Sequence, residues 1–151
     1  MILTFEILDS YTLIKHVHTF ISGAFLVIAV WLIIRSVRGI IRDIAYTRLD
    51  KYLSYGFIIN LYLQLIFGFI LFANHNAAVD DNYSNAAGAI KIVANRFWPV
   101  EHMILMLFAL FIANLGLILS SQSLTDKEKH KKVLTYYSIA IFMITISLIA
   151  I

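Results

Sequence analysis

The chain alternates between long apolar runs, which carry charged residues only near their ends, and polar connections. Four runs reach the roughly 17–25 residues that a membrane-spanning helix needs, and they cover about residues 13–34, 53–73, 100–119 and 133–151. Many of their residues are β-branched, which in water would favour strands. A bilayer offers no partner to unpaired backbone groups, so runs of this length predict helices instead. The pattern therefore predicts an all-α protein, a four-helix transmembrane bundle.

Composition supports a lipid environment for the whole chain. Hydrophobic residues make up 61% of the 151 residues and charged residues 14%, whereas about 25% of an average soluble domain is charged. We therefore expect one integral membrane domain over residues 1–151, with the lipid bilayer as its first partner. The chain has no cysteine, which excludes disulfides, iron–sulfur clusters and thiolate zinc sites.

The basic residues are concentrated in the first and third connections. These hold nine of the 12 lysines and arginines, namely Arg35, Arg38, Arg42, Arg48, Lys51, Lys127, Lys129, Lys131 and Lys132. The positive-inside rule places both connections in the cytoplasm. We expect up-down-up-down topology in a bacterial inner membrane, with both termini on the outer, periplasmic side. The positive charge then needs no nucleic-acid partner.

The second connection, over residues 75–98, is the long outer loop of this topology. Apolar residues from Ala86 to Phe97 recur at helical spacing, which predicts a short helix lying on the membrane surface. Trp98 is expected to anchor the chain at the interface, and Pro99 to be the first residue of the third spanning helix.

Two histidines are candidate ligands of a haem. His18 lies about five residues into the first span and His102 about three into the third, so a rise of about 1.5 Å per residue puts both near the outer face. Imidazoles from two facing helices of a bundle are the axial ligands of a bis-histidine haem. We therefore expect haem b, with its iron held by His18 and His102. The alternative is that both are ordinary interfacial histidines. His16 lies on a different helix face and is a poorer ligand, and His130 is expected to be solvated in the third connection.

Four further side chains are candidates to line the cofactor site. One turn below the two histidines, or on the neighbouring second span, lie Ser22, Met106, Tyr62 and Gln64. An amide at membrane depth must point into the bundle, because lipid offers it no partner. Gln64, with Tyr62 nearby, could line a cofactor or quinone pocket, or could simply hydrogen-bond to a neighbouring helix. Asn114 of the third span and Ser138 and Thr145 of the fourth could complete this polar interior, or could be ordinary hydrogen-bonding residues between helices.

Several function classes find no support in the sequence. The interiors of the spans carry no Asp, Glu, Lys or Arg, and ion-coupled transporters normally need ionisable groups near mid-membrane. There is no Gly-rich phosphate loop and no H-E-x-x-H motif. We therefore expect an electron-transfer or accessory subunit rather than a self-contained catalyst.

The spacing of several short motifs resembles that of a known family. His18 opens the first span, Leu63-Gln64-Leu65 precedes Gly68 in the second, and Val100-Glu101-His102 with Met106-Leu107 opens the third. In these motifs the chain resembles a family of small four-helix bacterial membrane proteins, frequent in Bacteroidetes and loosely catalogued as cytochrome b-like. Relatives often carry a histidine before the Leu-Gln and a proline after the Val-Glu-His. Those positions are Tyr62 and Met103 here.

Two functions follow as expectations. The first is a haem b-binding or haem-derived membrane subunit that serves electron transfer beside a larger respiratory complex, with a quinone as a further candidate partner. The alternative is an accessory subunit without a cofactor that packs against a larger membrane complex. The first function requires a cavity between the first and third helices near the outer face, whereas an accessory subunit can fill that space with side chains.

Overall fold

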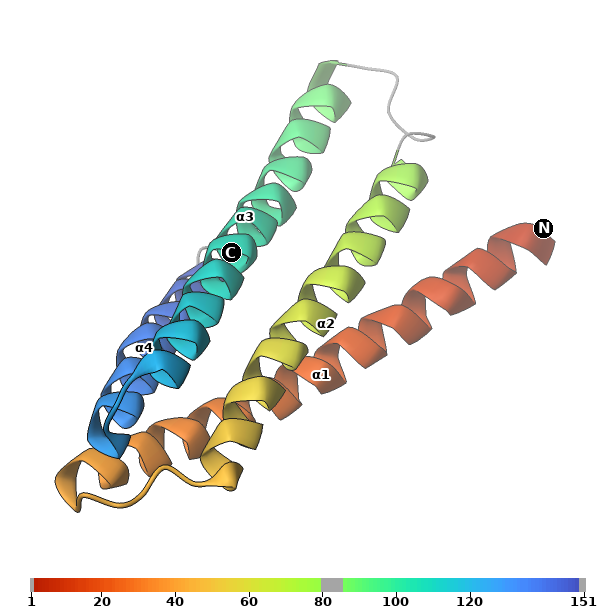
Figure 1. Cartoon of the computed structure of the whole chain (residues 1–151). Helices are drawn as coiled ribbons and strands as arrows, with labels where there is room; N and C mark the ends of the chain where they lie inside the picture. Colours follow the sequence, from red (N-terminus) through yellow and green to blue (C-terminus); the bar gives the residue numbers. More distant parts are fainter. Residues whose placement is uncertain (1, 80–85, 150–151) are drawn as a thin grey trace.

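The computed structural model contains four α-helices (Figure 1). It describes residues 2–79 and 86–149, with side chains for 10–74 and 99–149. The helices are α1 (Ile2–Ile41), α2 (Arg48–Val79), α3 (Ala86–Gln122) and α4 (Asp126–Ile149), and the described residues include no strand. Each helix has a segment long and apolar enough to cross a membrane. The prediction of an all-helical chain with four helices long and apolar enough to span a membrane is therefore confirmed.

The helices extend well beyond the predicted spans. α2 continues to Val79 and α3 begins at Ala86, so helix replaces most of the predicted outer loop over 75–98. Residues 80–85 of that loop lie outside the described residues. Pro99 lies inside α3, so the predictions of a separate surface helix and of a helix start at Pro99 are wrong. Helical spacing on both sides of Pro99 favours one continuous helix. The hydrogen bond that proline removes is a tolerated loss in spanning helices.

The four helices pack in a closed ring. α1 contacts α2 and α4, and α3 contacts α2 and α4, with the most extensive contact between α3 and α4. Gly116 allows that close approach, because a Cβ there would lie 2.5 Å from Cβ of Tyr136. At the centre the Phe57 ring stacks on Tyr137 at 4.6 Å between centroids and contacts Phe25 at 5.0 Å. Aromatic packing thus joins α1, α2 and α4.

One face of α4 forms the wall of the core. Its buried residues, at alternating spacings of three and four, are His130, Val133, Tyr137, Ala140, Ile144 and Ser147. Thr145 lies off this face and is exposed, and its hydroxyl donates to the Ile141 carbonyl of its own helix. The expectation that Thr145 faces the interior is therefore wrong. The interior hydroxyl near the end of α4 is that of Ser147.

The α1–α2 and α3–α4 connections meet at one end of the bundle (Figure 1). Nζ of Lys127 lies 2.9 Å from Oδ1 of Asp43 across them. Beside this contact, Asp50 accepts hydrogen bonds from the backbone N–H and the hydroxyl of Thr47, both at 2.8 Å, and caps the start of α2. Arg35 of α1 pairs with the same carboxylate. Charged groups therefore join α1 to α2 at this basic end.

His130 is buried at the basic end, so the expectation that it is solvated is wrong. Only 1% of its surface is exposed. Its Nε2–H donates to the Ile44 carbonyl at 3.2 Å, and its ring meets the Tyr46 ring edge-on at 5.0 Å. Gly39 provides the space, since a Cβ there would overlap the imidazole. His130 therefore links α4 to the end of α1 and the connection that follows it.

Candidate functional site

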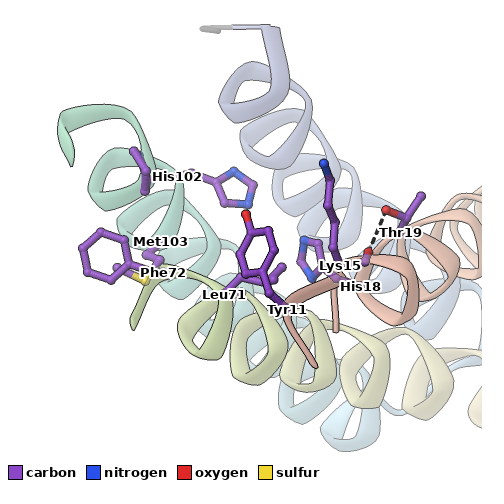
Figure 2. Close-up of a pocket in the computed structure, with 10 residues that line it drawn as sticks. Tyr11, Lys15, His18, Thr19, Leu71, Phe72, His102 and Met103 are labelled. Atoms are coloured by element: carbon purple, nitrogen blue, oxygen red, sulfur yellow. Dashed lines mark hydrogen bonds between the residues drawn. The ribbon is translucent and has the colours of Figure 1, made fainter. Parts of the chain in front are cut away.

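A cavity of about 490 Å³ lies between α1, α2 and α3, at the end of the bundle opposite the basic connections. His18 lines it from α1, His102 from α3 and Gly68 from α2. Figure 2 shows both imidazoles turned toward this cavity, with the Tyr11 ring close to them. A cavity therefore lies between the first and third helices, at the end of the bundle opposite the basic connections.

His102 is oriented by a hydroxyl from α4. Its Nδ1 lies 3.1 Å from Oγ of Ser147, and that hydroxyl donates its own hydrogen to the Ile144 carbonyl at 2.6 Å. Ser147 must therefore accept a hydrogen bond from Nδ1–H of His102. In a neutral imidazole this places the lone pair on Nε2. A hydrogen bond from the other ring nitrogen is also the usual arrangement for a histidine that ligates a metal.

His18 is held more loosely. Its Nδ1 is buried without a hydrogen-bond partner among the described residues, which is unusual for a buried polar atom. Opposite its ring lies Gly68, where a Cβ would stand 3.7 Å from Cε1 of His18. A larger side chain at position 68 would extend into the space beside this imidazole.

A polar contact between α1 and α2 lies one turn below His18. Nε2 of Gln64 donates to Oγ of Ser22 at 2.9 Å, and that hydroxyl donates to the His18 carbonyl at 2.8 Å. Asn60, a further turn along α2, donates to the Ile21 carbonyl at 3.2 Å. These side chains support the helix that carries His18, and they do not line the cavity itself.

The structure separates two of the predicted site residues from the histidines. Met106 is 5% exposed and packs in the central core. Tyr62 is 46% exposed on another face of α2, and its phenol oxygen lies 3.5 Å from Nδ2 of Asn114 in α3. The prediction that Tyr62 lines the site is wrong, because its position on α2 turns it away from Gln64 and Gly68. His16 is exposed, and the His75 side chain lies outside the described residues.

Sequence reasoning missed several lining residues. Tyr11 and Lys15 reach the cavity from the two turns that precede His18. Lys15 is three residues from His18, a spacing that places both on one helix face. Sequence reasoning also missed Ser147, the hydrogen-bond partner of His102. Its spacing from Tyr137 and Ile144 on α4 was the only sequence signal that it shares their helix face. Only the packing of the helices shows which face of α4 is buried.

The arrangement suits a cofactor that brings its own metal ligands. The described residues contain no group of three or more His, Asp or Glu side chains that could hold a bare metal ion. Two imidazoles from separate helices can instead supply the axial ligands of a porphyrin-bound iron. Neither a protein-family model, nor a curated protein, nor a solved structure matches this chain. Function must therefore be argued from the cavity itself.

We expect Ser147→Ala to destabilise the protein by about 1–2 kcal/mol, because Nδ1–H of His102 loses its acceptor in a half-buried site. Equilibrium unfolding in detergent measures this change. Ser138→Ala, on the same helix and also half-buried, is the matched control and should change stability by about 0.5 kcal/mol or less. Equal losses in the two variants would contradict the role of Ser147.

Proposed function

We propose that this chain is a small haem b-binding membrane subunit that serves respiratory electron transfer, with His18 and His102 as axial ligands. The observation that carries this proposal is that imidazoles from α1 and α3 line one cavity. The porphyrin provides the remaining iron ligands, so two histidines suffice. A haem b bound there would supply one-electron transfer.

The residues around the two histidines support the proposal. The cavity, at about 490 Å³, falls within the range of about 300–1,000 Å³ found for small-molecule and cofactor sites. Lys15 lines it together with the imidazoles and offers an ammonium group to an anionic substituent such as a propionate. Leu71, Phe72 and Met103 give it an apolar wall. Such a wall limits water access, which tunes a metal's reduction potential.

The distribution of basic residues supports a proposal for the side of the membrane on which this cavity lies. The basic connections favour the cytoplasmic side, so we propose up-down-up-down topology in the inner membrane with both termini outside. His18 and His102 would then lie near the periplasmic face, where a larger respiratory complex could exchange electrons with the haem.

A reduced-minus-oxidised visible spectrum of the detergent-purified protein, expressed with haem supplied, tests the proposal. We expect the α-band of a b-type haem in the wild type and its loss in His18→Ala and in His102→Ala, because each variant removes an axial ligand. Imidazole added to the variants should restore a six-coordinate spectrum, which a merely unfolded variant would not show. His16→Ala is the matched control, since His16 is an exposed histidine of the same helix and should keep the band.

Two outcomes would overturn the proposal. One is a wild type without the band despite the haem supply. The other is a band that persists in both His18→Ala and His102→Ala. Either result would leave the accessory subunit without a cofactor as the leading function, and the proteins that co-purify with the chain would then be the next object of study.

A further inference from the structure

A second pocket, of about 300 Å³, lies at the basic end of the bundle. It is enclosed by the first turns of α2, the last turns of α3 and the first turn of α4. Three cationic side chains line it, those of Arg48, Lys51 and Lys129, together with the hydroxyls of Ser120 and Ser121. Cations from α2 and α4 thus converge on one small volume, beside two α3 hydroxyls that donate their hydrogens to the carbonyls of Lys129 and Ile118.

The acidic residues nearby leave part of this positive charge uncompensated. Asp50 is paired with Arg35 of α1, and Asp126 lies 3.5 Å from Nζ of Lys129. Within the described part of the chain, Arg48 and Lys51 form no ion pair. Lys51 only approaches the Tyr55 ring, at 6.0 Å from Nζ to the centroid. Two cations of the pocket therefore remain available to an anion.

Tyr46 adds a neutral wall. It lines the pocket, and its phenol oxygen lies 3.2 Å from Oγ of Ser54. Burial raises the pKa of Tyr46 above its ordinary value, so the phenol carries no negative charge that would oppose an anion at physiological pH.

We infer that this pocket binds a phosphate group at the membrane surface. Phosphate oxygens accept strong hydrogen bonds from guanidinium and ammonium donors. Basic pockets between spanning helices on the cytoplasmic side are the usual sites for anionic lipid head groups. A phospholipid and a free phosphate share this chemistry.

The pocket's shape favours the phospholipid as the source. Tyr55 lies one turn beyond Lys51 on α2, and Leu117 lies one turn before Ser121 on α3, and both line the pocket. The cations therefore lie at the outer end of the pocket, and an apolar wall continues from them toward the membrane interior. A head group can occupy the cations while its acyl chains follow this wall.

Thermal unfolding of the purified full chain in neutral detergent tests the inference. We expect saturating phosphatidylglycerol to raise the Tm by about 5 °C, whereas phosphatidylcholine with the same acyl chains should raise it far less. The double variant Arg48→Gln/Lys51→Gln should bind phosphatidylglycerol about 30-fold more weakly. Lys131→Gln/Lys132→Gln removes the same charge from exposed residues of α4 outside the pocket, and should bind like the wild type.

Inorganic phosphate, added in a separate arm, distinguishes the two sources. A Tm rise with phosphatidylglycerol alone identifies a lipid head group, and an equal rise with inorganic phosphate identifies a free anion. The inference is overturned if neither ligand raises the Tm. It is also overturned if the two double variants lose affinity equally, because the attraction would then come from the general positive charge of this end.

Discussion

Gly39→Ala will destabilise the protein by about 3 kcal/mol, although it adds a single methyl group to a helix. A Cβ at position 39 would overlap three atoms of the His130 ring. That ring is 1% exposed and is held by its hydrogen bond to the Ile44 carbonyl, so it has no free space to enter. Overpacking costs about 1–3 kcal/mol, and loss of the bond to Ile44 adds about 1 kcal/mol.

Gly23→Ala is the matched control for this prediction. Gly23 lies in the same helix, and a Cβ there would meet no atom within 4 Å. Alanine favours a helix over glycine by up to about 1 kcal/mol, so this variant should be unchanged or slightly stabilised. Equilibrium unfolding in mixed detergent micelles measures both. Adding His130→Ala to Gly39→Ala should recover part of the loss, and equal stabilities of the two glycine variants would contradict the close contact.

The four helices could be predicted because they depend on local properties of the chain. A run such as 133–151 is too long and too apolar for any other arrangement in lipid. The depth of a residue in the membrane follows from the same count of residues. This count placed His18 and His102 at the same depth without any knowledge of the helix contacts. The length of the apolar runs thus predicted the four helices, and the residue count predicted a common level for the two histidines, which both line one cavity.

The other residues of the site depend on how each helix is rotated about its own axis, because that rotation decides which side chains face the interior. The sequence of a uniformly apolar helix does not reveal this rotation. Tyr62 and Gln64 are two residues apart, yet Gln64 is buried against Ser22 while Tyr62 is exposed. On α4 the apolar residues surround the helix, so the sequence did not reveal that the interior hydroxyl near its end is that of Ser147 and not that of Thr145. His130 was missed for a related reason. Its neighbours in sequence are lysines, while the space that buries it is created by Gly39, a distant residue of another helix.

The other large effect is expected at the ion pair of Arg35 and Asp50, where Arg35→Met should destabilise the protein by about 3 kcal/mol. Nε of Arg35 donates to Oδ1 of Asp50 at 2.5 Å and Nη2 donates to Oδ2 at 3.0 Å. The carboxylate is 5% exposed. Removing the guanidinium leaves a buried charge served only by the donors of Thr47, and such a loss costs about 3–5 kcal/mol. We take the lower end because the Arg35 side chain keeps 27% of its surface exposed.

Arg38→Met separates this effect from the loss of a positive charge near the membrane. Arg38 is an exposed arginine of the same helix, so its replacement should change stability by about 0.5 kcal/mol or less. The double variant Arg35→Met/Asp50→Asn should be more stable than Arg35→Met alone, because no buried charge remains. If Arg35→Met and Arg38→Met unfold alike, the pair contributes nothing to stability. A large difference between them would show that the ion pair of Arg35 and Asp50 joins α1 to α2 at the basic end. The general positive charge of the α1–α2 connection would then be too weak to account for that stability.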